Sequence, residues 1–337
     1  MSTANVVPET WNLGVGHPWR LMRRTGARKL LRDAFVRMRY ADGFSHARSL
    51  AFLTSLLLVQ GCIAMVGLAS AIGDNRVSDG IVRMIRSAAP GPAGRLLTEA
   101  VAHAHRAGAE HRYTALVIGL IGSLVTGSTL LGQLERGLNR LYGVELDRPA
   151  VLKYGLAFCL AVTTGALATV AFVAVAFGRA VGTEKNNHTL DSIWAVARWP
   201  VAFLFMFVAT MALFRWCPRR QQPSWSWLSI GAGVAVLLWL AVTYVLGLTF
   251  RLSKTFGDTY GPLAGIVALQ FWALLSTMGV VFGASTGAQL EAIRAGESRP
   301  RDEEKAEASE PEPVGSPSTV PETVSASEME PRPAAIG

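Results

Sequence analysis

The chain has 337 residues, of which half are hydrophobic and only 17% are charged, and its mean hydropathy is +0.32. A soluble domain normally carries about a quarter charged residues, so this composition excludes a typical soluble protein and points to a lipid bilayer. The formal net charge is +8. Such a charge could suggest a nucleic-acid partner, but in a membrane protein the distribution of Lys and Arg along the chain matters more than their sum. We therefore expect no nucleic-acid partner.

Long apolar windows predict the fold class. A membrane-spanning helix needs roughly 20 apolar residues to cross a hydrocarbon core of about 30 Å. The largely uncharged windows of this length are 50–72, 114–133, 151–178, 193–214, 228–250 and 262–283. We therefore predict an all-α polytopic membrane protein, with a bundle of six transmembrane helices inside a membrane domain at 46–294.

The positions of Lys and Arg predict the orientation. If the N-terminus is cytoplasmic, 21 of the 32 Lys and Arg residues lie in segments on the inner side and 11 on the outer side. Basic residues concentrate in short cytoplasmic loops. We therefore expect a multi-pass protein of the bacterial cytoplasmic (inner) membrane, with both termini in the cytoplasm.

The segment before the first window is strongly basic. Residues 1–18 are expected to be flexible, and residues 19–45 are expected to form a cytoplasmic amphipathic helix. Residues 19–39 place Trp19, Leu31 and Phe35 among eight Lys and Arg residues. This pattern is typical of a helix on the anionic inner leaflet, so membrane lipids are the expected partner. We favour a topology anchor over specific recognition of a headgroup.

The segments outside the bundle are a loop and a tail. Residues 73–113 are expected to form two short helices on the outer side. Histidines 103, 105 and 111 lie there, but residues two apart on a helix point in different directions, so we expect no metal site and no cofactor. Residues 295–337 are rich in Glu, Pro, Ser and Ala, which predicts a disordered cytoplasmic tail.

Polar residues gather where the second window ends, in GQLERGLNRLYG. Glu135 and Asn139 share one helix face, and Arg136 and Arg140 share another. With arginines at similar depth, they predict a binding site for an anion or headgroup at the cytoplasmic mouth; the alternative is an ordinary positive flank with an ion pair. The candidate residues are Arg48, Gln133, Glu135, Arg136, Asn139, Arg140 and Arg215.

The centres of the windows contain no ionisable side chain, although such groups commonly mark functional sites in membranes. The candidates that remain are uncharged, and hydrogen bonds between helices explain them equally well. They are Gln60, Thr126, Ser128 and Gln270.

Four motifs follow one another along the chain: HARSLAF, TLLGQLERGLNRLYG, FRWCP and YGPLAG. Their order resembles the YihY/BrkB family of bacterial inner-membrane proteins, once labelled ribonuclease BN, and the resemblance runs from about His46 to Glu291. It implies a six-helix bundle with cytoplasmic termini, but no settled activity. The chain departs from the family at Gln60, where members often have proline, and at Ser285, where they have an acid. The second departure argues against cation or proton coupling through a carboxylate there.

Two functions are compatible with these features, and a third is not expected. We favour a transporter or flippase of an anionic or amphiphilic envelope solute, which predicts a polar cavity and interrupted helices near Gly61, Gly127 or Pro262. A non-transporting scaffold in envelope assembly predicts a tightly packed bundle. An enzyme is not expected, because a nuclease needs clustered metal ligands. A second copy of the chain and other envelope proteins stay open as partners.

Overall fold

The computed structural model describes residues 4–11, 17–72, 91–177, 188–252, 262–297 and 299–301, and helices dominate them. The helices are α1 (Pro18–Thr25), α2 (Ala27–Tyr40), α3 (Gly43–Ile72), α5 (Gly91–Leu141), α6 (Ala150–Phe177), α7 (His188–Trp216), α8 (Trp225–Leu252) and α10 (Pro262–Arg294). One isolated β-bridge joins Ala4 to Arg301. The prediction of an all-α protein is confirmed for the described residues.

Four helices have stretches that are long and apolar enough to cross a bilayer. These stretches are Gly43–Met65 in α3, Leu116–Leu141 in α5, Trp225–Phe250 in α8 and Leu263–Arg294 in α10. Shorter apolar stretches lie in α6 and α7, which are 28 and 29 residues long. Each predicted window falls within one of these six helices, except that residue 178 lies outside the described residues.

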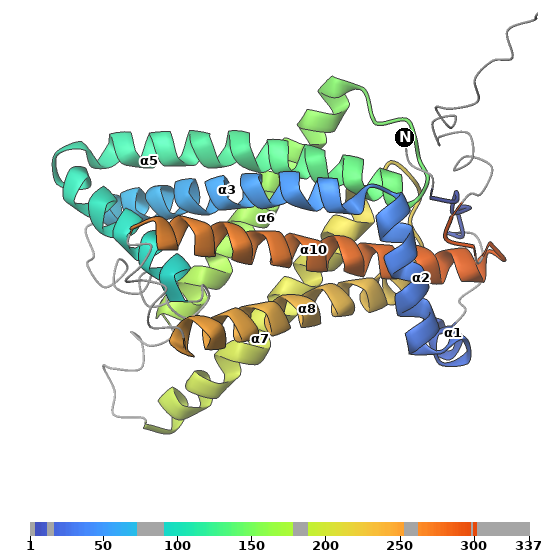
Figure 1. Ribbon diagram of the computed structural model, residues 1–337. Helices are drawn as coiled ribbons and strands as arrows, with labels where there is room; N and C mark the ends of the chain where they lie inside the picture. Colours follow the sequence, from blue (N-terminus) through green and yellow to red (C-terminus); the bar gives the residue numbers. More distant parts are fainter. Residues whose placement is uncertain are drawn as a thin grey trace, which may run out of the picture.

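The long helices pack so closely that glycine is required where they cross. A Cβ atom added to Gly119 of α5 would lie 2.5 Å from the backbone nitrogen of Ala64 in α3. A Cβ atom added to Gly283 of α10 would lie 2.5 Å from the carbonyl oxygen of Gly231 in α8. Small residues allow membrane helices to approach in this way, and Figure 1 shows α3, α5, α10 and α8 running along one another.

The beginning of α5 differs from the expected short helices of the outer loop. Residues 73–90 lie outside the described residues, but from Gly91 the chain forms one helix of 51 residues. Its first turns bury Ala93, Leu97 and Val101 in a cluster with residues of α3, α8 and α10. In Figure 1 the α5 ribbon bends, so that these turns lie across the ends of the neighbouring helices. The segment is therefore part of the packed bundle.

The N-terminal segment also differs from the expectation. The single amphipathic helix predicted for 19–45 is two helices, because the chain turns at Gly26, whose φ is +82°. Residues 4–11, expected to be flexible, bury Ala4, Val7 and Thr10. We call the end of the bundle that carries residues 4–11, α1 and α2 the basal end. The predicted disordered tail falls largely on residues 302–337, outside the described residues.

The contact between α8 and α10 generates a prediction. Gly283→Ala places a methyl group against the backbone of α8, so the helices must separate, and overpacking of this kind costs about 1–3 kcal/mol. The matched control is Gly233→Ala on α8, whose added Cβ atom would be 3.8 Å from its nearest neighbour, Phe207. Thermal unfolding of the purified protein in detergent should show a lower midpoint for Gly283→Ala only; equal midpoints would contradict the close crossing.

Candidate functional site

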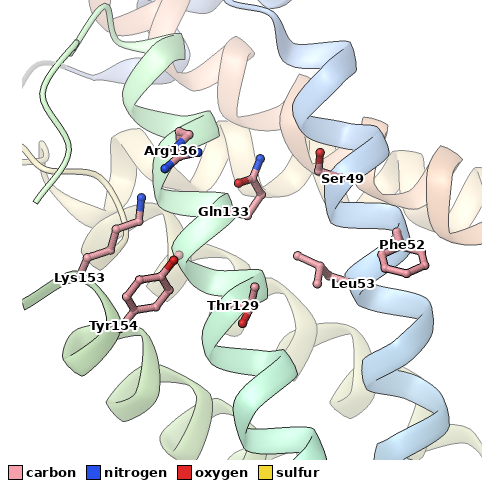
Figure 2. Close-up of a pocket in the computed structure, with 9 residues that line it drawn as sticks. Ser49, Phe52, Leu53, Thr129, Gln133, Arg136, Lys153 and Tyr154 are labelled. Atoms are coloured by element: carbon pink, nitrogen blue, oxygen red, sulfur yellow. The ribbon is translucent and has the colours of Figure 1, made fainter. Parts of the chain in front are cut away.

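A half-open groove of about 320 Å³ lies between α3, α5 and α6 near the basal end. Figure 2 shows the side chains that surround it. They are Ser49, Phe52 and Leu53 from α3, Thr129, Gln133 and Arg136 from α5, and Lys153 and Tyr154 from α6, with Gly132 completing the lining.

The groove has a polar end and an apolar wall. Arg136, Gln133 and Lys153 gather on one side, whereas Phe52 and Leu53 form the opposite wall on α3 (Figure 2). Gly132 permits the approach of α6, because a Cβ atom there would lie 3.2 Å from Cε1 of Tyr154. Such a lining can hold a molecule with an anionic head and an apolar chain.

Asp147, in the loop between α5 and α6, is the acidic partner of the groove's cations. Its Oδ2 atom lies 3.1 Å from both Nε of Arg136 and Nζ of Lys153, and Asn139 donates a hydrogen bond to Oδ1. Burial alone would raise the pKa of Asp147, but the hydrogen bonds from Asn139, Lys153 and Arg136 hold it at about 2. Because two cations share one carboxylate, this end of the groove keeps a net positive charge.

Of the seven candidates proposed for the mouth, Gln133 and Arg136 line the groove. Glu135 is buried elsewhere, 3.2 Å from Arg148. Arg215 closes the loop before α8 by donating to the carbonyls of Gln222 and Pro223.

The other three candidates lie at the same end of the bundle but outside the groove. Asn139 is fully buried, and its Oδ1 atom accepts a hydrogen bond from the backbone N–H of Arg219. Arg48 is exposed and donates to Ser45, while Arg140 is half-buried. Sequence reasoning missed Lys153 and Tyr154, which open α6; a lysine at the start of an apolar window was the available signal.

Two of the four uncharged candidates within the membrane, Gln270 and Ser128, form hydrogen bonds with other residues of the bundle. Ser55 of α3 donates to Oε1 of Gln270 in α10 at 2.5 Å, and Ser128 donates to the carbonyl of Leu124 within α5. Thr126 is buried. Gln60 faces Gly122 of α5, and its buried Oε1 atom has no hydrogen-bond partner.

A buried ion pair at the basal end was not foreseen. Arg220, in the loop before α8, lies 2.7 Å from Oε1 of Glu291 on α10, and both side chains are only 2% exposed. Thr10 donates a second hydrogen bond to this carboxylate, and the Arg220 guanidinium stacks 4.4 Å from the ring centre of Tyr142. Burial is the main cause that raises the pKa of Tyr142.

Arg37 of α2 joins three further segments at the same end. Its Nε atom donates to Gln289 of α10 at 2.7 Å, and its Nη1 atom donates to the carbonyls of Asn5 and Leu141. The side chain is fully buried, and this burial lowers its pKa to about 10. Nearby, Ser285 donates to the carbonyl of Ala34. Ser285 therefore ties α10 to α2.

The described residues define a class: a helical integral membrane protein with a tightly packed bundle, a polar network at its basal end and a lateral groove. The chain belongs to the family described as virulence factor BrkB, whose model matches residues 34–308. No group of three or more His, Cys, Asp or Glu side chains able to hold a metal ion occurs in the described part of the chain.

Curated relatives agree with this assignment. A protein of Bacillus subtilis, YfkH, whose name describes it as ribonuclease-like, is 26% identical over 77% of this chain and 94% of its own length. A UPF0761 membrane protein of Xanthomonas oryzae is 26% identical over 82% of this chain, but the match spans 65% of that longer protein. One from Rhodospirillum centenum is 28% identical over 53% of this chain and 39% of its own length. No solved structure matches the chain.

The buried ion pair makes a prediction about stability. Glu291→Gln removes the charge that compensates Arg220 and should cost about 3–5 kcal/mol, because an unpaired charge is left buried. The control is Arg136→Gln, which breaks a half-exposed pair and should cost at most about 1 kcal/mol. Urea or thermal unfolding in detergent measures both, and a similar loss for the two variants would refute the distinction.

The low pKa of Asp147 makes a prediction about pH. Because folding depresses this pKa from 3.8 to about 2, the stability contributed by the ionised carboxylate is complete above about pH 4 and is lost as the pH falls through about 2. The difference in unfolding midpoint between wild type and Asp147→Asn should therefore shrink across this window. A difference that does not vary with pH between 5 and 2 would show that the carboxylate is not held ionised.

Proposed function

We propose that this protein is a transporter or flippase that takes up an anionic amphiphile from the inner leaflet of the bacterial cytoplasmic membrane. The six helices each cross the bilayer, and both termini lie in the cytoplasm, in accord with the excess of basic residues in the inner segments. The groove between α3, α5 and α6 is the observation that carries the proposal.

The lining of the groove supports an amphiphile better than a small ion. Arg136 and Lys153 retain N–H donors beyond those given to Asp147, and hydrogen bonds to charged groups contribute about 1.5–3 kcal/mol each. The apolar wall of Phe52 and Leu53 offers a place for the first methylenes of an acyl chain. Since Arg136 and Tyr154 are exposed at the bundle surface, a lipid reaches this site sideways from the membrane.

A specific observation favours a second candidate, a scaffold that moves no solute. The helices α3 and α5 run through Gly61 and Gly127 without the interruptions that commonly mark transport sites. In this alternative the groove holds a structural lipid and the basal end holds partner proteins.

We also propose that the chain is not a nuclease, although the name of one relative describes it as ribonuclease-like. Metal-dependent hydrolysis needs carboxylates or histidines that converge on an ion. The acid beside the groove, Asp147, is instead occupied by Arg136, Lys153 and Asn139.

Reconstituted vesicles test the proposal. In liposomes that contain fluorescent phosphatidylglycerol, the wild-type protein should speed the transfer of this lipid between leaflets, measured by quenching of the outer leaflet. Transfer by the Arg136→Gln, Lys153→Gln double variant should be about tenfold or more slower than by the wild type. The control is Arg48→Gln, which removes an exposed cation on α3 outside the groove.

The possible results separate the two functions. Loss of transfer in the double variant, with normal transfer in Arg48→Gln, supports the groove as the transport site. If wild-type protein retains phosphatidylglycerol through the groove but does not move it, the scaffold is supported. Equal transfer by all variants would remove the groove from the mechanism.

A further inference from the structure

Helix α2 has two apolar faces, of which one is buried in the bundle and the other is largely exposed. Leu30, Ala34 and Met38 are buried, and Leu30 lies in a cluster with Trp227 of α8 and Leu290 of α10. The second face is made by Leu31, which is 39% exposed, and by Phe35, which is 49% exposed. These two residues are one helical turn apart and adjoin the buried face. Phe35 meets the ring of Phe44 in α3 edge to face, with 5.9 Å between the ring centres, but its remaining surface and that of Leu31 stay open.

Basic side chains continue around the helix from this exposed apolar face. At about 100° per residue, Arg28 and Arg32 lie beside Leu31 and Phe35, on the side away from the bundle. The exposed basic residues of α1 and α2 are Arg20, Arg23, Arg24, Arg28, Lys29, Arg32 and Arg39. Within the described part of the chain none of them forms an ion pair, and Asp33 is the one acid on these two helices.

The depth of α2 follows from its contacts with α10. Ser285 donates to the carbonyl of Ala34, and Gln289 accepts from Arg37. The apolar stretch of α10 extends to Arg294, but the window predicted from the sequence ends at residue 283. If the hydrocarbon core ends with that window, the rise of 1.5 Å per residue places α2 about 3–9 Å beyond it. The headgroup layer occupies roughly the first 5–8 Å. In Figure 1 α2 crosses the basal end at a steep angle to the long helices, as an interfacial helix does.

We infer that α1 and α2 form an interfacial platform that binds the headgroups of anionic lipids. Leu31 and Phe35 enter the boundary of the acyl chains, and the arginines beside them contact lipid phosphates, as in amphipathic helices that lie on membranes. Trp19 of α1 is also exposed and supplies an interfacial aromatic side chain. The platform is separate from the groove and stands whichever proposed function is correct.

The buried side of the platform gives lipid binding a structural consequence. Arg37 and Ala34 connect α2 to the end of α10, and Arg37 also holds Asn5 and the end of α5. Attraction between anionic lipid and the arginines of α2 therefore stabilises the position in which α2 packs on the network that closes the basal end. A neutral bilayer lacks this attraction.

Cysteine labelling tests the orientation of α2. Leu31→Cys and Lys29→Cys place thiols at two positions that are both exposed in the protein but face different directions. In nanodiscs that contain phosphatidylglycerol, a membrane-impermeant maleimide should modify Lys29→Cys at least tenfold faster than Leu31→Cys, after subtraction of the rate of wild-type protein. Equal rates would overturn the interfacial placement.

Charge removal tests the preference for anionic lipid. In mixed nanodiscs, native mass spectrometry of the released protein measures retained phosphatidylglycerol relative to phosphatidylcholine. Arg28→Gln with Arg32→Gln should lower this ratio about 25-fold, since each basic residue near an anionic surface contributes roughly fivefold. The matched control is Arg95→Gln with Arg299→Gln, which removes two exposed cations elsewhere and should leave the ratio unchanged. An equal effect of both pairs, or no effect of either, would refute the platform.

Discussion

Close contact between helix backbones is the constraint on which the rest of the structure depends. In a bilayer an apolar side chain gains little by leaving lipid for protein, so helices associate through packing and hydrogen bonds. Gly231 and Gly283 bring α8 and α10 together, and Gly67 and Gly119 do the same for α3 and α5. The relative height of the helices is thereby fixed, and so are the positions of the polar groups at their ends.

Because the relative height of the helices is fixed, charged groups can be buried in pairs at the basal end. Arg220 and Glu291 lie 71 positions apart in sequence, and their desolvation is tolerable because both partners are held at hydrogen-bond distance. Thr10 and the backbone of residues 4–11 complete the network, so the beginning of the described chain closes the end of the bundle. Arg37 extends the network to α2, which makes the surface helix part of the bundle's own polar interior.

The groove is open because α6 meets the other helices mainly at α5. On α6, Tyr154, Phe158 and Val162 are exposed, whereas the described part of α10 is mostly buried. In the proposed function, this open lateral groove would give a lipid access from the membrane without a path through the packed centre. Asp147 keeps Arg136 and Lys153 in place when no other anion is bound, and it competes with any anion that enters.

The sequence by itself determined the helices, because apolar length and the near absence of charge are local properties that a bilayer selects directly. It also indicated a basic amphipathic segment and a polar cluster after the second window, although it treated α1 and α2 as one helix. Only the tertiary structure decided which polar groups meet. Lys153 and Tyr154 join the groove, Arg37 reaches Gln289, and Glu291 reaches Arg220 because helices distant in sequence cross at particular heights. The height at which two helices cross cannot be derived from the periodicity of either one, because it is set by the packing between them.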